Sequence, residues 1–235
     1  MQRYFCNSNS DTFTLSSEDS YHITKVMRYD IGTKIEVVSN EELYLSEIIN
    51  LTPLVIAKKQ EKICVNLDKL NITIVQSLVK EQKMDYILQK GPELGASSFI
   101  PLITERSVVK INNKETKKIE RWNTIVKEAS EQSKRLDIPS VLSCCTIKEL
   151  AKLDYDYKLL CSVNEMSKSI KTVLSNINIS DRILIVVGPE GGFTNQEEEE
   201  LINNGFISVS LGDRVLRTET ASLFVLSIIN YIFMR

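Results

Sequence analysis

Histidine and paired cysteine are scarce in this sequence. Its 235 residues include one histidine, His22, and five cysteines, none of which forms a Cys-x-x-Cys pair. Because zinc sites are built mainly from histidine and closely spaced cysteine ligands, we expect no bound metal. An odd number of unpaired cysteines is also typical of a protein kept in a reducing compartment.

Long apolar runs and an excess of one charge are missing as well. The most apolar stretch, residues 223–234, is too short to span a bilayer, and the first residues lack the apolar core of a secretory signal. The net charge is −2 and the isoelectric point is near 5.7. We therefore expect a cytoplasmic protein with no membrane partner, in which any contact with nucleic acid depends on a local basic patch.

The first part of the chain has the pattern of a small β-domain. With 43% hydrophobic and 26% charged residues the composition is that of an ordinary globular protein, and the length suits one small and one larger domain. Up to residue 68, short apolar stretches alternate with polar turns, interrupted by a helical piece near residues 21–29. This pattern predicts a small β-barrel over residues 1–68.

From residue 72 to 235 the pattern changes to apolar runs that alternate with helical periods, which is typical of a mainly parallel α/β sheet. The predicted strands are residues 72–79, 99–103, 158–163, 183–187 and 206–210. The predicted helices are residues 83–94, 117–134, 168–175, 196–204 and 219–233. The sequence thus predicts an α/β domain after the barrel.

Two loops of this second domain attract attention. Gly-Pro-Glu-Gly-Gly-Phe at 188–193 follows one predicted strand, and Leu-Gly-Asp-Arg-Val-Leu-Arg-Thr-Glu-Thr-Ala at 211–221 follows another. Neither matches a dinucleotide fingerprint or a triphosphate P-loop. Because ligands bind at the carboxyl ends of parallel strands, the two loops are candidate walls of one small-molecule pocket.

Some residues near these loops have a structural explanation. Thr194 and Glu197 form a capping box, so the acidic run 197–200 is interpreted as a helix start. Thr218 is a suitable helix N-cap and Glu219 suits the first turn. Helix capping and the helix start do not explain Arg214 and Arg217, which follow Gly212 in the second loop.

The two loop sequences together resemble the paired signature of the RsmE family, SPOUT-class enzymes that methylate N3 of a uridine in small-subunit (16S) ribosomal RNA. The similarity extends along nearly the whole chain. Further matching segments are His22 with 26–28, 76–80, 83–85, 89–90 with 93–95, 101–109, 121–122, and 128–129 with 131–132. The resemblance implies a PUA-like β-barrel at the amino end and a carboxy-terminal α/β domain with a deep trefoil knot.

The resemblance also implies S-adenosylmethionine as cofactor and assigns residues to it. The implied cofactor-binding residues are Gly188, Glu190, Gly191, Gly192, Leu211, Gly212, Leu216 and Thr218. The chemistry of methylating N3 points to Arg217 as a stabiliser of negative charge on the uracil carbonyls and to Glu219 as a possible proton acceptor.

Two departures from the family pattern occur. Gly91-Pro92 stands where the family has Ala-Thr or Val-Thr, so a helix kink is expected there. After Glu131-Gln132 the family continues with a small residue, glycine and arginine, but here Ser133, Lys134 and Arg135 follow. The backbone of this turn is therefore an open question.

Residues 104–135 form the most basic long stretch, with nine Lys or Arg against five Glu. The candidates for RNA phosphate contacts are Arg106, Lys110, Arg121, Lys134 and Arg135. The expected RNA partner is small-subunit ribosomal RNA or the assembled 30S subunit. A second copy of the chain is also expected, because residues 220–234 carry no charge and need to be buried. Two alternatives remain: a SPOUT methyltransferase acting on transfer RNA, and a non-catalytic RNA-binding or ribosome-assembly protein of the same fold.

Overall fold

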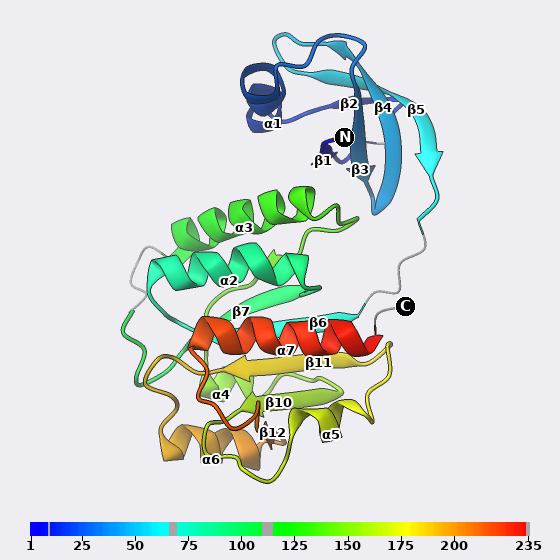
Figure 1. The fold of residues 1–235 in the computed structure, drawn as a ribbon. Coiled ribbons are helices and arrows are strands. Elements are labelled where there is room, and N and C mark those ends of the chain that lie inside the picture. Colours follow the sequence, from blue (N-terminus) through cyan, green and yellow to red (C-terminus); the bar gives the residue numbers. More distant parts are fainter. Residues whose placement is uncertain (9, 66–69, 110–114, 234–235) are drawn as a thin grey trace. The chain divides into compact units, whose positions relative to one another are not determined.

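A computed structural model describes residues 1–8, 10–65, 70–109 and 115–233 (Figure 1). The chain divides into two compact units, residues 1–67 with Ser130–Asp137 and residues 68–129 with 138–235. A domain boundary after residue 68 was predicted, and it stays a prediction because residues 66–69 lie outside the described part. The inclusion of Ser130–Asp137 in the first unit was not anticipated.

The first unit is a five-stranded sheet in the order β1-β3-β4-β5-β2, in which only the β1–β3 pair is parallel. Its elements are β1 (Arg3–Phe5), β2 (Thr12–Thr14), α1 (Ser17–Tyr21), the π-helix η1 (His22–Met27), β3 (Lys34–Ser39), β4 (Glu42–Asn50) and β5 (Ile56–Ile63). Asn40 and Glu41, both at positive φ, make the tight turn between β3 and β4. Alternate strand residues such as Ile35 and Val37 are fully buried in its core.

The second unit is a three-layer α/β structure. Its seven-stranded sheet has the order β12-β10-β11-β6-β7-β8, with β9 also pairing with β7, and all the pairs are parallel. The strands are β6 (Asn71–Ser77), β7 (Ser98–Ile103), β8 (Ser140–Val141), β9 (Cys145–Thr146), β10 (Tyr157–Cys161), β11 (Arg182–Val187) and β12 (Ile207–Val209). The predicted alternation of strands and helices is confirmed, whereas β1, β8 and β9 were not predicted.

Helices cover both faces of this sheet (Figure 1). They are α2 (Glu81–Glu93), α3 (Glu115–Gln132), α4 (Ile147–Leu150), α5 (Ile170–Leu174), α6 (Asn195–Asn203) and α7 (Thr218–Phe233). Along β11, Ile183 and Ile185 pack towards α2, α3, α5 and α7, while Leu184 and Val186 pack towards α4 and α6. Among the described residues no helix is long and apolar enough to cross a membrane.

The two departures from the family pattern are accommodated locally. Pro92 lies in the last turn of α2, and a Cβ at Gly91 would come 2.5 Å from Cζ of Phe99, so glycine is required there for packing. Lys134 has φ 58, the left-handed conformation that glycine favours. Its N–H bonds to Glu131 O and that of Arg135 to Ser130 O, which is a Schellman ending of α3. The turn thus keeps a glycine-type backbone without the glycine.

Candidate functional site

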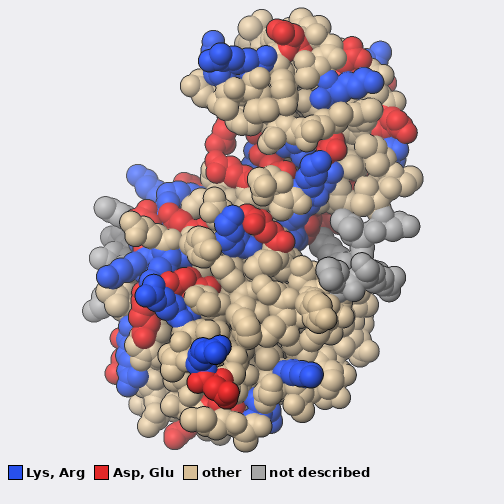
Figure 2. Space-filling model, viewed as in Figure 1, with Lys and Arg blue, Asp and Glu red and all other residues tan. Residues whose placement is uncertain are grey.

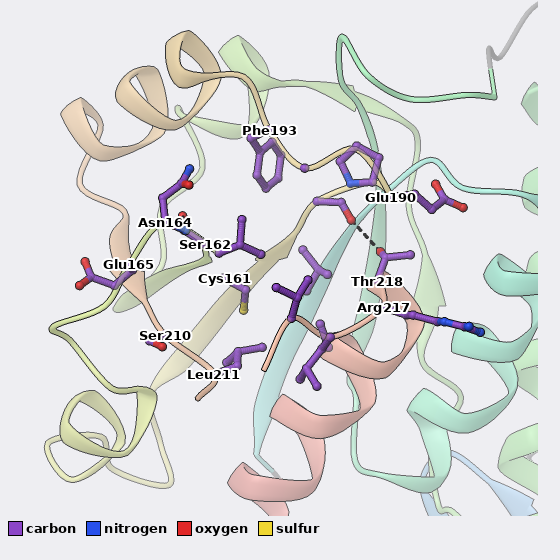
Figure 3. A pocket seen from close by; sticks show the side chains of 18 of the residues that line it. Cys161, Ser162, Asn164, Glu165, Glu190, Phe193, Ser210, Leu211, Arg217 and Thr218 are labelled. Atoms are coloured by element: carbon purple, nitrogen blue, oxygen red, sulfur yellow. Dashed lines mark hydrogen bonds between the residues drawn. The ribbon is translucent and has the colours of Figure 1, made fainter. Parts of the chain in front are cut away.

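A cavity of about 620 Å³ lies at the carboxyl ends of β10, β11 and β12 (Figure 3). Three loops surround it, each following one of these neighbouring parallel strands, together with the start of α7. Because all three strands run in the same direction, their loops meet at one edge of the sheet. The volume falls within the range of about 300 to 1,000 Å³ that is usual for small-molecule sites.

The residues predicted to bind a cofactor gather around this cavity. Those that line it are Gly188, Glu190, Gly191, Gly192, Leu211, Gly212, Leu216 and Thr218. The two loops singled out in the sequence are therefore walls of one cavity, while the role of each residue in binding stays a prediction. Gly192 and Gly212 have φ of +67° and +114°, at which any other residue is strained.

The third wall, residues 161–166 after β10, was not predicted from the sequence. Ser162 donates to Glu198 Oε1 at 2.8 Å and Asn164 Nδ2 to Glu198 Oε2 at 3.2 Å, which anchors this loop to α6. Hydrogen bonds from the Ser167 hydroxyl and from the N–H groups of Lys168 and Ser167 lower the pKa of Glu165 to about 2. This wall could have been predicted, because a strand was predicted at residues 158–163 and the loop after it lies at the same edge of the sheet.

Thr218 does not cap α7, contrary to the interpretation of the sequence. The first helical bond of α7 runs from Ala221 N to Arg217 O at 2.8 Å, so the helix cap is one residue earlier. The hydroxyl of Thr218 donates instead to Gly188 O at 2.6 Å and accepts a hydrogen bond from Gln76 Nε2 at 2.8 Å. Thr218 thereby connects α7 to the loop after β11 and to strand β6.

Arg106, a predicted RNA contact, lies against residues 188–193, the glycine-rich loop after β11. Its Nη1 donates to Gly191 O at 2.9 Å and to Phe193 O at 3.1 Å. Beside it, the N–H of Glu105 donates to Glu197 Oε1 at 2.8 Å, so the loop after β7 is attached twice to the segment that begins α6. Glu197 also completes the predicted capping box with Thr194, which is confirmed.

A charged cluster stands at one side of the cavity. Lys83, in the first turn of α2, lies with its Nζ 3.3 Å from Glu190 Oε1 and 3.2 Å from Glu219 Oε2. Burial alone would lower the pKa of Lys83, but hydrogen bonds to Glu219 and Glu190 outweigh it and raise that pKa. Lys83 thus links Glu219 to Glu190 in the loop after β11, while Glu219 does not itself line the cavity. Lys83 was not among the predicted site residues.

Arg217, like Arg214, differs from Arg106 in the part of the site that the structure describes, because no partner holds its guanidinium. It lines the cavity and is exposed, and within the described part of the chain its guanidinium has no hydrogen-bond or ion-pair partner. Its side chain extends away from Thr218 (Figure 3). A free cation at the mouth of a cavity is available for a ligand.

The other RNA candidates that the structure describes, Arg121, Lys134 and Arg135, do not line this cavity. Arg121 is paired with Asp85 and Glu81, and Arg135 is paired with Asp137. Lys134 and Arg135 belong to the first unit, and Lys110 lies outside the described residues. Within the ranges the structure describes, no group of three or more potential metal ligands occurs.

Comparison with known proteins places this chain in a class. A family model described as an RNA methyltransferase domain matches residues 66–230, which makes the chain an RNA methyltransferase by family. The chain is also 36% identical to the ribosomal RNA small subunit methyltransferase E of Bacillus subtilis, over 98% of this chain and 96% of that one. It therefore belongs to the ribosomal RNA small subunit methyltransferase E family.

Solved structures agree with this assignment. The chain is similar to the ribosomal RNA small subunit methyltransferase E from Neisseria gonorrhoeae bound to S-adenosyl methionine, with 32% identity, a TM-score of 0.88, and coverage of 99% of this chain and 98% of that one. It is also similar to a putative methyltransferase from Legionella pneumophila in complex with bound SAM, with 28% identity, a TM-score of 0.90 and the same coverage.

Proposed function

We propose that this protein transfers the methyl group of S-adenosylmethionine to N3 of a uridine in small-subunit ribosomal RNA. Membership of the family supports the reaction and the class of RNA, and the cofactor bound to the two similar structures supports the donor. The structural observation that carries the proposal is the cavity formed by three loops at the carboxyl ends of β10, β11 and β12.

The residues around this cavity fit such a cofactor. Its charged lining is balanced, with four carboxylates and four cations: Glu165, Glu190, Glu198, Asp213, Lys83, Arg106, Arg214 and Arg217. A triphosphate would demand an excess of cations, whereas S-adenosylmethionine carries no phosphate and has both positive and negative groups. Gly192 has φ of +67°, and a Cβ there would meet nothing within 4 Å, so its backbone is open to a ligand. We infer that the three loops hold the adenosine part through backbone groups.

The chemistry assigns roles to two further residues. Bound S-adenosylmethionine supplies an electrophilic methyl group, and the chain must align it with N3 and handle the N3 proton. The free guanidinium of Arg217 stabilises the negative charge that develops on a uracil carbonyl as the proton leaves. Glu219 is the candidate acceptor of that proton, and Lys83, 3.2 Å away, holds its carboxylate next to Glu190.

Finer features of the fold belong to this proposal. A PUA-like barrel is supported by the Cys6 thiol, which donates to Thr14 O at 3.2 Å and so joins the two end strands of the first sheet. A trefoil knot is supported by the course of residues 210–217, which leave edge strand β12 and reach Thr218, bonded to Gly188 after β11. We infer that α7 is threaded through the loops on either side of it.

A homodimer is proposed from the surface of α7. No residue from Thr220 to Phe233 is charged, Phe224, Tyr231 and Ile232 are exposed, and the surface over α7 is largely free of charge (Figure 2). The helix is covered on the side that packs on the sheet, so a second copy would bury the other side. Ile232→Arg should then give monomers by sedimentation, while a wild-type protein that sediments as an active monomer at micromolar concentration would refute the dimer.

Cofactor binding tests the proposal against a non-catalytic RNA-binding protein. Calorimetric titration of the wild-type protein with S-adenosylmethionine should show one site per chain. A Cβ at Gly191 would lie 3.4 Å from the Arg106 side chain, so Gly191→Ala should bind nearly normally, whereas the branched side chain of Gly191→Val should weaken binding severely. Absence of binding by the folded wild-type protein would refute the proposed function.

A further inference from the structure

A buried polar network lies beneath the cavity. It joins Gln76 of β6, Thr218 and Ser222 of α7, and Gly188 after β11. Gln76 and Ser222 are completely buried, and neither lines the cavity. A buried polar network is costly unless each member is satisfied, so the directions of its hydrogen bonds are well defined.

The orientation of the Gln76 amide follows from its neighbours. One end of the amide is 3.1 Å from Ser77 O, a carbonyl that can only accept, so this end must be the nitrogen. The same nitrogen donates its second proton to Thr218 Oγ1 at 2.8 Å. Gln76 Oε1, at the other end, accepts the proton of Ser222 Oγ at 2.6 Å.

The hydroxyl of Thr218 has a fixed direction as a result. Since Thr218 Oγ1 accepts from Gln76, its own proton is free for Gly188 O, 2.6 Å away, which can only accept (Figure 3). Each of these two oxygens retains one unused lone pair, and no proton of the network is left over. Thr218 and Gly188 both line the cavity, so the Thr218 hydroxyl and the Gly188 carbonyl can only accept a hydrogen bond from a ligand.

We propose that Gln76 is a specificity-determining positioning residue: by donating to Thr218 it holds the Thr218 hydroxyl against Gly188 O, so that both oxygens present lone pairs to the cavity and select a hydrogen-bond donor of the cofactor. This inference rests on the proposed function, because it takes the ligand to be S-adenosylmethionine. The donors of its nucleoside are the 6-amino group of adenine and the two ribose hydroxyls. An analogue with an oxygen in place of the 6-amino group would set acceptor against acceptor.

The expected penalty is measurable. An unpaired buried acceptor or a pair of opposed acceptors weakens binding by about 10- to 100-fold. The probes are S-adenosylhomocysteine, its inosine analogue with a 6-oxo group, and its 2′-deoxy and 3′-deoxy analogues, each titrated calorimetrically. The wild-type protein should discriminate by at least about 10-fold against the analogue whose missing donor faces Thr218, which also tells the base from the ribose.

Two matched pairs of variants test the network. Thr218→Val removes the hydroxyl and should bring the affinity ratio to within about threefold of unity, while Thr218→Ser keeps the hydroxyl and should keep the discrimination. Gln76→Leu removes the donor that holds the Thr218 hydroxyl in place, so it should also lose discrimination. Ser222→Ala damages the same network without touching the Gln76–Thr218 bond, so it should retain discrimination.

The affinity ratio separates positioning from loss of structure, since general destabilisation would weaken all the analogues alike. Fluorescence of Trp122, the single tryptophan, reports whether each variant is folded. If Gln76→Leu does not fold, the Thr218 pair decides. Equal discrimination in Thr218→Val and wild type, or retained discrimination in folded Gln76→Leu, would overturn the inference. A wild-type protein that binds none of the probes would refute the proposed function instead.

Discussion

Arg106→Ala is expected to weaken cofactor binding even when no RNA is present. Arg106 Nη1 bonds to two carbonyls of the glycine-rich loop, Gly191 O at 2.9 Å and Phe193 O at 3.1 Å. Hydrogen bonds from a charged donor contribute about 1.5 to 3 kcal/mol each when shielded from water. The arginine is exposed, so we discount both bonds together to about 1 to 2 kcal/mol.

That free energy corresponds to a rise in Kd of about 5- to 30-fold, provided that the loop must be held in place to bind. The assay is calorimetric titration with S-adenosylhomocysteine in buffer without RNA. Arg106→Lys retains the positive charge but has a shorter side chain, so it should give an intermediate affinity. Arg121→Ala, whose guanidinium pairs with Asp85, is the control and should bind normally.

A phosphate contact would behave differently. If Arg106 acts only on RNA, Arg106→Ala should bind S-adenosylhomocysteine with an unchanged Kd, and Arg106→Lys should bind RNA nearly as well as wild type. An unchanged Kd in both variants would refute the assignment of Arg106 to the cofactor loop.

Three further predictions test other parts of the structure. Arg217→Ala should slow single-turnover methyl transfer by about a hundredfold at saturating cofactor, and a normal rate would assign Arg217 to structure. Lys134→Gly should raise the free energy of unfolding by about 0.5 to 1 kcal/mol. The left-handed φ of 58° costs a residue with a side chain about 1 to 2 kcal/mol, and part of the gain from relieving it is offset because glycine has more conformational entropy in the unfolded chain. A lower melting temperature of the glycine variant would contradict backbone strain at Lys134. Burial raises the pKa of the Cys161 thiol to about 12, so the thiol stays protonated and unreactive at pH 8, and mass spectrometry after alkylation should find exposed Cys64 modified first. Faster labelling of Cys161 than of Cys64 would contradict this.

The positions of the cavity walls could be predicted because they follow from chain order. A loop that follows a parallel strand lies at one known edge of the sheet, so the sequence alone predicts that residues 188–193 and 211–218 lie together. The loop after β10 obeys the same rule and was overlooked because it contains no glycine and no arginine. The rule therefore applies to any loop that follows a parallel strand, whether or not that loop contains glycine or arginine.

The contacts inside the site could not be predicted in the same way. The bond from Gln76 to Thr218 joins residues 142 positions apart and depends on which strands are adjacent and on side-chain rotamers. Thr218 looked like a helix cap from its local sequence, but the nearby Gly188 carbonyl is its partner in the folded chain. Lys134 likewise has a backbone imposed by the Schellman ending, which overrides the conformational preference of lysine.

Methyl transfer to mapped RNA tests the central claim most directly. The wild-type protein is incubated with radiolabelled S-adenosylmethionine and either free small-subunit ribosomal RNA or assembled small subunits from a strain that lacks this methylation. One labelled uridine, methylated at N3, is expected, and Arg217→Ala, which still binds the cofactor, should give strongly reduced labelling. No label in either substrate, or label on an atom other than uridine N3, would contradict this assignment.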